Sequence, residues 1–145
     1  MAVAVRIARA FTKKDKIAFC GYHGWSDWYL AANLANKKNL DGQLLPGLEP
    51  LGVPRCLKGT AIPFNYNKIE ELEKIVKKND IGVIVMEPRR EHEPKKGFLE
   101  AVRKIANRIG AVLIFDEVTS GFRMNVGGIF MLYKVYPDIA VFGKG

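Results

Sequence analysis

The sequence predicts an α/β fold in which helices cover both faces of a mostly parallel sheet. Short apolar runs at residues 16–20, 81–86, 111–115 and 139–142 alternate with segments whose apolar residues recur at helical spacing. These runs are apolar throughout, as strands buried on both faces must be. Glycine or an acidic residue follows each run and ends it. We therefore expect four strands joined by crossover connections.

The N-terminal half contains one clear helix and one clear strand. Residues 3–11 predict a helix with these apolar residues toward the core: Val3, Ile7, Ala10 and Phe11. Residues 16–20 form the first strand, and residues 25–36 are compatible with a helix. Residues 39–59 show no periodicity, and an irregular segment of about twenty residues in a compact domain usually has a function.

The C-terminal half carries clearer signals of where its helices begin and end. Asn67 is expected to cap a helix, and Glu70 three residues later completes a capping box. Residues 97–109 predict an amphipathic helix that ends at Gly110. Two weaker elements, a strand and a short helix, are predicted at residues 61–64 and 129–136.

Composition limits the class of protein. The chain has 145 residues, 48% of them hydrophobic, which suffices for one domain with a core. Its net charge of +8 is spread over scattered lysine pairs, so we expect neither a nucleic-acid nor a membrane partner. Two cysteines, Cys20 and Cys56, exclude a disulfide scaffold and favour a reducing, cytoplasmic location. With only two histidines, no metal site is expected.

The residues that follow the strands are the candidates for function, because ligands of parallel sheets bind at the carboxyl ends of strands. Asp116 ends one buried run, and Lys144 follows the next. If these strands are neighbours, both side chains reach one crevice. The pair is either a satisfied ion pair or a Schiff-base lysine beside a carboxylate that holds a protonated pyridinium. Tyr22, at another strand end, could stack on such a ring.

Several segments resemble one enzyme family. Residues 114–123, Ile-Phe-Asp-Glu-Val-Thr-Ser-Gly-Phe-Arg, resemble the pyridinium-binding segment of class III aminotransferases, which are pyridoxal-phosphate enzymes of fold type I. Tyr22-His23-Gly24, followed by Asp27, resembles their ring-stacking segment, in a form most similar to glutamate-1-semialdehyde 2,1-aminomutase-like members. Further segments in the family's order are residues 52–54, 66–67, 87–88 and 136–144. The resemblance extends from Val3 to Lys144.

The resemblance implies a catalytic role for Lys144. Its amine would hold the cofactor as an internal aldimine and then move a proton to give the ketimine. Asp116 would pair with the pyridinium nitrogen. Val118 would lie on the ring face opposite Tyr22.

The resemblance also implies cofactor-binding roles that are less direct. His23 and Gly24 would shape the turn beneath the ring, although a buried histidine is more often structural. Glu87 would lie near the ring hydroxyl. Arg123 resembles a common family residue to which no role is assigned.

The resemblance covers only the middle of the family's large domain. Residues 1–145 are therefore interpreted as a partial pyridoxal-phosphate-binding domain, an incomplete fold type I large domain. We did not find the family's phosphate loop or its smaller domain in the sequence. A sheet that lacks strands leaves an unpaired edge, so we expect marginal stability.

Two hypotheses remain. The chain is a segment of an aminotransferase or aminomutase that acts on a small-molecule amino donor and a carbonyl acceptor, as a homodimer. Alternatively, it is a truncated, non-catalytic fragment that binds pyridoxal phosphate weakly or not at all. The sequence does not separate transferase from mutase.

Overall fold

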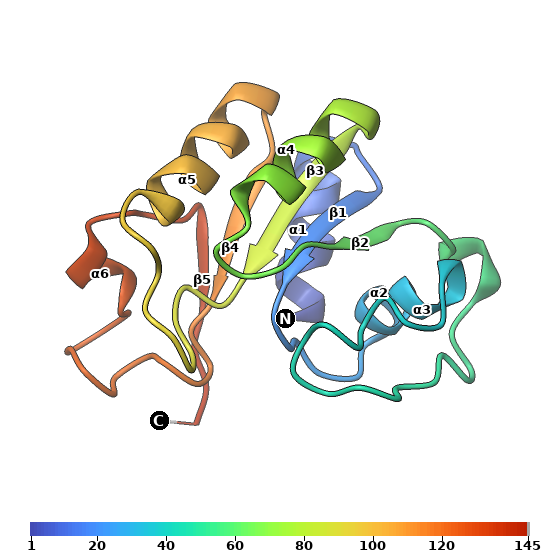
Figure 1. Ribbon diagram of the computed structural model, residues 1–145, viewed down its shortest axis with the longest axis horizontal. Helices are drawn as coiled ribbons and strands as arrows, with labels where there is room; N and C mark the ends of the chain where they lie inside the picture. The colour runs from blue at the N-terminus through green and yellow to red at the C-terminus, as the bar shows by residue number, and fades with distance from the viewer. Residues whose placement is uncertain (145) are drawn as a thin grey trace.

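The computed structural model describes residues 1–144 and contains a five-stranded parallel sheet (Figure 1). The strand order is β2-β1-β3-β4-β5. The strands are β1 (Lys16–Cys20), β2 (Ala61–Pro63), β3 (Ile81–Met86), β4 (Val112–Asp116) and β5 (Ile139–Val141). The predicted parallel sheet is confirmed, and the weak strand at residues 61–64 joins it as the edge strand β2, beside β1.

Helices cover both faces of the sheet, as predicted. Helix α1 (Ala2–Thr12) lies on one face, and helices α4 (Ile69–Lys78) and α5 (Phe98–Ile109) lie on the other (Figure 1). The central strand β3 is uniformly apolar because both of its faces are buried. Val83 and Val85 pack toward α1, while Ile84 and Met86 pack toward α4 and α5. The chain therefore has two core clusters, one on each side of the sheet.

The remaining helices are short and lie in the connections. They are α2 (Asp27–Leu30), α3 (Ala32–Ala35), the 3-10 helix η1 (Arg55–Leu57) and α6 (Phe130–Tyr133). The helix predicted over residues 25–36 is thus two single-turn helices. Among the described residues, no helix combines the length and the apolar character needed to cross a membrane.

The predicted core face of α1 is wrong. Its large apolar residues Val3, Ile7 and Phe11 are 72%, 56% and 80% exposed, and Ala10 is also exposed. The buried residues are Ala4, Val5 and Ala8. Small side chains let a helix backbone lie close to the strands beneath it. Periodicity located the helix correctly but selected the wrong face, and two of the three residues on the buried face are alanines.

The predicted capping box at Asn67 is also wrong. Asn67 has a left-handed backbone conformation, and α4 begins two residues later without a side-chain cap. The Asn67 side chain instead accepts a hydrogen bond from the backbone N–H of Lys95 at 2.8 Å and donates one to the Glu93 carbonyl at 3.2 Å. Its amide therefore fixes the loop between β3 and α5, while Glu71 rather than Glu70 reaches back to accept from the Asn65 N–H.

Candidate functional site

The buried pair of Asp116 and His23 lies at the carboxyl ends of β4 and β1. The Nδ1 of His23 lies 2.8 Å from the Asp116 carboxylate, and both side chains are almost fully buried. The second carboxylate oxygen of Asp116 accepts a hydrogen bond from the Val118 N–H at 3.1 Å. Asp116 is thus positioned from two sides by segments that lie far apart in the sequence.

The hydrogen bonds of His23 determine where its protons are. Its Nε2 lies 2.9 Å from the Cys20 carbonyl oxygen, which can only accept, so Nε2 carries a proton. An ionised carboxylate also only accepts, so Nδ1 carries a second proton when Asp116 is charged. The geometry therefore fits a buried imidazolium–carboxylate pair.

Aromatic rings enclose His23. Trp28 stacks on it with a centroid separation of 5.8 Å, while Phe19 and Tyr29 present edges at 6.4 Å and 5.8 Å. These rings exclude water from the Asp116–His23 pair. Trp28 is buried, whereas Trp25, three residues earlier, is 70% exposed.

The strand that ends at Asp116, β4, and the strand that precedes Lys144, β5, are neighbours. The interpretation of Lys144 as a Schiff-base lysine beside Asp116 required this arrangement. Asp116 is paired in register with Val141 of β5, three residues before Lys144. The Val118 side chain lies near Gly143, since a Cβ built on that glycine would lie 3.4 Å from it. Lys144 is exposed, and among residues 1–144 no ion pair joins it to Asp116. The alternative of a satisfied Asp116–Lys144 ion pair is therefore wrong.

The other predicted cofactor residues lie at the end of β1. Tyr22 is half-buried and packs edge-on against Tyr29 at 5.9 Å. Gly24 has a φ of +89°, which glycine adopts without strain. The structure places Tyr22, His23 and Gly24 at the same edge of the sheet as Asp116. Their predicted contacts with a cofactor ring stay predictions.

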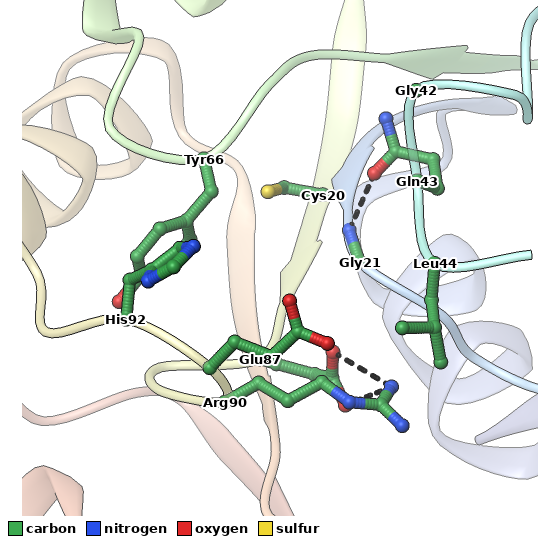
Figure 2. A pocket seen from close by; sticks show the side chains of 10 residues that line it. Cys20, Gly21, Gly42, Gln43, Leu44, Tyr66, Glu87, Arg90 and His92 are labelled. Carbon is green, nitrogen blue, oxygen red and sulfur yellow. Dashed lines mark hydrogen bonds and ion pairs between the residues drawn. The ribbon is translucent and has the colours of Figure 1, made fainter.

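Glu87 lines a cavity of about 220 Å³ between the ends of β1 and β3 (Figure 2). Its carboxylate accepts from the Arg90 guanidinium at 3.2 Å and 3.4 Å. Figure 2 also shows Gln43, whose side-chain oxygen accepts from the Gly21 N–H at 2.7 Å. The irregular segment at residues 39–59 thus contributes a wall of this cavity. Gly21 is required here, because its φ is +102° and a Cβ would lie 2.8 Å from a Glu87 oxygen.

Two site features were not found from sequence. Arg90 faces Glu87 from the loop after β3, where no motif marks it. Glu117 is fully buried, and its carboxylate accepts from the Ser120 hydroxyl and the Phe130 N–H. Its place next to Asp116, within residues 114–123, was the signal in the sequence. Glu117 fixes the loop that follows β4, and with it the position of Val118.

Burial raises the pKa of Glu87 above its ordinary value of 4.5, and the nearby Arg90 charge opposes this shift only in part. Glu87 therefore binds its proton more tightly in the folded chain than in the unfolded chain. This tighter proton binding stabilises the fold at low pH, and the stabilisation is lost as pH rises through the pKa of Glu87 in the folded chain. We expect Glu87→Gln to gain stability relative to the parent chain between pH 4 and pH 7. Urea unfolding across this range measures the difference. Glu100→Gln, which removes an exposed carboxyl of α5, is the matched control. A difference that shrinks as pH rises would contradict the assignment.

Burial also raises the pKa of the Cys20 thiol, with the Glu87 charge adding to the effect. The thiolate form is therefore disfavoured, and Cys20 serves as a small apolar residue, as its place inside a strand predicts.

Comparison with known proteins gives one family. The family model described as "Aminotransferase class-III" matches residues 1–145. Among curated relatives, 3-aminobutyryl-CoA aminotransferase of Cloacimonas acidaminovorans (strain Evry) is 38% identical over 98% of this chain and 32% of its own length. Glutamate-1-semialdehyde 2,1-aminomutase 2 of Lachnoclostridium phytofermentans is 38% identical over 97% of this chain and 34% of its own. The chain thus spans about a third of the length of these relatives.

Solved structures of transaminases have a similar fold over almost the whole chain. An omega-transaminase from Sphaerobacter thermophilus superposes with a TM-score of 0.79 at 27% identity, over 99% of this chain and 34% of that one. A structure described as a transaminase with PLP bound gives a TM-score of 0.78 at 30% identity, over the same shares. The predicted fold type, as a partial segment, is confirmed.

Proposed function

The chain belongs to the class-III aminotransferase family, and on this premise we propose that it forms part of an enzyme that moves amino groups with pyridoxal phosphate. The cofactor would lie at the carboxyl ends of β1, β4 and β5. Residues 1–145 would then be part of the cofactor-binding large domain. The observation that carries the proposal is the buried Asp116–His23 pair beside the segment that bears Lys144.

The residues at this edge fit that cofactor. A protonated pyridine nitrogen is a hydrogen-bond donor that pairs with a carboxylate, and Asp116 is the carboxylate that His23 orients at this edge. Tyr22 offers an aromatic face, and Val118 offers a branched apolar side chain at the end of β4. Bound pyridoxal phosphate supplies an electron sink that stabilises negative charge on the substrate carbon.

Lys144 would hold the cofactor through its amine and later move the proton at the substrate carbon. Its side chain is exposed, and within residues 1–144 no ion pair with a carboxylate holds it. The guanidinium of Arg123 donates to the Lys144 carbonyl oxygen at 3.3 Å. This contact ties the reacting residue to the loop after β4.

The substrates are proposed from the family. Class-III aminotransferases use an amino donor and a keto acid, and we propose a small-molecule donor and a carbonyl acceptor of this kind. One relative is a transferase and another is a mutase, and both are 38% identical to this chain. We therefore propose amino transfer without assigning one of these two outcomes. A homodimer in the cytoplasm is the assembly and location that we propose.

Covalent labelling tests this proposal. The chain is mixed with pyridoxal phosphate, reduced with borohydride, digested and mapped. We expect modification concentrated at Lys144, abolished at that site in Lys144→Ala and weakened in Asp116→Ala. Lys134→Ala, which removes another exposed lysine, is the matched control and should leave Lys144 labelling unchanged. Modification spread evenly over surface lysines would instead support a chain that does not form the cofactor site by itself.

A further inference from the structure

The cavity that Glu87 lines lies next to the proposed cofactor site, and we name it the Glu87 cavity. Its volume of about 220 Å³ is roughly that of seven water molecules, at about 30 Å³ each. Gly21 lines the cavity and directly precedes Tyr22, the residue proposed to stack on the cofactor ring. A substrate that reacts at the cofactor could therefore extend into this cavity.

The Glu87 cavity carries charges of both signs. Its lining includes the carboxyls of Glu87 and Glu91 and the guanidinium of Arg90. One terminal nitrogen of Arg90 donates to both oxygens of Glu87, and the Arg90 side chain makes no other hydrogen bond to residues 1–144. Glu91 is exposed and forms no ion pair within the same part of the chain. The cavity therefore keeps free donors on Arg90 and free acceptors on Glu91.

Neutral polar groups on opposite sides of the cavity are already held in place. The Gln43 side chain accepts from the Gly21 N–H at 2.7 Å and donates to the Phe64 carbonyl at 3.4 Å. The Tyr66 hydroxyl donates to the Pro88 carbonyl at 2.7 Å, so toward a ligand it can only accept. Figure 2 shows Tyr66 on one side of the cavity and Gln43 on the other. Such fixed side chains lower the cost of ordering a binding site.

This mixture of groups favours hydroxyl groups over charged ones as ligands. A carboxylate in the cavity would face Glu87 and Glu91, and an ammonium group would face the free donors of Arg90; like charges placed side by side are costly. A hydroxyl group both donates and accepts, so it can donate to Glu91 and accept from Arg90. Tyr66 adds an aromatic surface, whose negative face suits the C–H groups of a hydroxylated chain. A polyhydroxylated chain makes use of all these groups.

We propose that the Glu87 cavity binds the hydroxylated end of a substrate, through Glu91, Arg90 and Tyr66. The inference rests on the proposed function. It narrows the substrates to amines, or the corresponding carbonyl compounds, that carry several hydroxyl groups away from the reacting carbon. Open-chain amino sugars have this chemistry. Glu87 would position Arg90 instead of contacting the ligand, because its carboxylate already accepts from that guanidinium.

Glucamine, a linear six-carbon amine with five hydroxyl groups, is the probe. Hexylamine, which has the same carbon number and the same ammonium group but no hydroxyl groups, is the matched control ligand. Binding of each to the 145-residue chain is followed by ¹H–¹⁵N NMR at constant pH and ionic strength. We expect glucamine to bind with a Kd in the millimolar range and to shift the signals of the Gln43 side-chain amide and the Gly21 N–H. Hexylamine should bind at least about tenfold more weakly, because it makes no hydroxyl hydrogen bonds.

Two variants test whether the site is local. Glu91→Ala should weaken glucamine binding by about tenfold, as the loss of a hydrogen bond to a charged group does. Glu91 is exposed, so this change leaves the core intact. Glu70→Ala, which removes an exposed carboxyl of α4 outside the cavity, is the matched control and should leave binding unchanged. Equal weakening in both variants, hexylamine binding as tight as that of glucamine, or no binding of glucamine overturns the proposal.

The labelling experiment at Lys144 separates this inference from the proposed function. Glucamine binding that depends on Glu91, without selective labelling of Lys144, would leave the hydroxyl site standing and reject the cofactor site. Selective labelling of Lys144, without glucamine binding, would reject the hydroxyl site and leave the proposed function intact. Arg90 is not used as a variant, because its removal would leave the buried Glu87 without its ion-pair partner.

Discussion

Asp116→Ala is expected to lower the free energy of unfolding by about 3–5 kcal/mol, the usual cost of removing one partner of a buried ion pair. The substitution leaves the Nδ1 of His23 without its hydrogen-bond partner, in a region closed by Trp28 and Phe19. A buried polar group that has lost its partner costs free energy relative to the parent chain.

Urea unfolding of the 145-residue chain measures this loss. Asp27→Ala, which removes an exposed carboxyl at the start of α2, is the matched control and should change stability by less than about 0.5 kcal/mol. The double variant His23→Phe, Asp116→Leu should recover part of the loss, because it removes both buried charges together. An Asp116→Ala variant as stable as the parent chain would contradict the buried ion pair.

Phe19→Ala is expected to cost about 3–5 kcal/mol, as truncation of a buried phenylalanine usually does. Phe19 is 0% exposed and lies at the centre of the aromatic group, with Tyr29 at 5.1 Å and Trp28 at 6.0 Å. Its removal leaves a cavity beneath His23. We therefore expect the loss of stability to be accompanied by a less rigidly held Asp116–His23 pair.

Two readouts test this prediction. Urea unfolding should show the loss, and near-ultraviolet circular dichroism should show a weaker signal from Trp28 and Tyr29. Phe122→Ala, which truncates a side chain that is 58% exposed, is the control and should cost far less. A Phe19→Ala variant with unchanged near-ultraviolet spectrum would contradict the packing of this aromatic group around His23.

The sheet was predictable because a strand that is buried on both faces needs apolar residues on both faces. The runs that became β1, β3 and β4 contain no alternation, and only a parallel sheet covered twice requires that. The orientation of α1 was not predictable in the same way. Alanine and isoleucine both count as apolar, but Ala4 and Ala8 fit against the sheet where Ile7 does not.

The candidate site was predicted in part. Asp116 and Lys144 could be assigned to one edge because parallel strands end at one edge of a sheet, and the β4–β5 pairing confirms that the strands leading to them are neighbours. The partner of Asp116 could not be found by this argument. His23 lies 93 residues away from it, and only the folded chain brings the two together.

Arg89 and Arg123 illustrate the same limit. They are 34 positions apart, and each alone resembles an ordinary solvated charge. Both line one cavity, formed by the loops that follow β3 and β4. This proximity cannot be obtained from spacing along the chain. Sequence located the edge of the sheet where function is expected, and tertiary structure selected its members.

The most direct test of the account is the protonation of the cofactor's ring nitrogen. Pyridoxal phosphate labelled with ¹⁵N is added to the chain, and its ¹⁵N chemical shift is followed from pH 6 to pH 9 in the parent chain and in Asp116→Asn. We predict a shift typical of a protonated pyridinium that persists to alkaline pH in the parent chain and is lost in Asp116→Asn. A ring nitrogen that titrates alike in both, as in free solution, would contradict the assignment of this edge as the cofactor site.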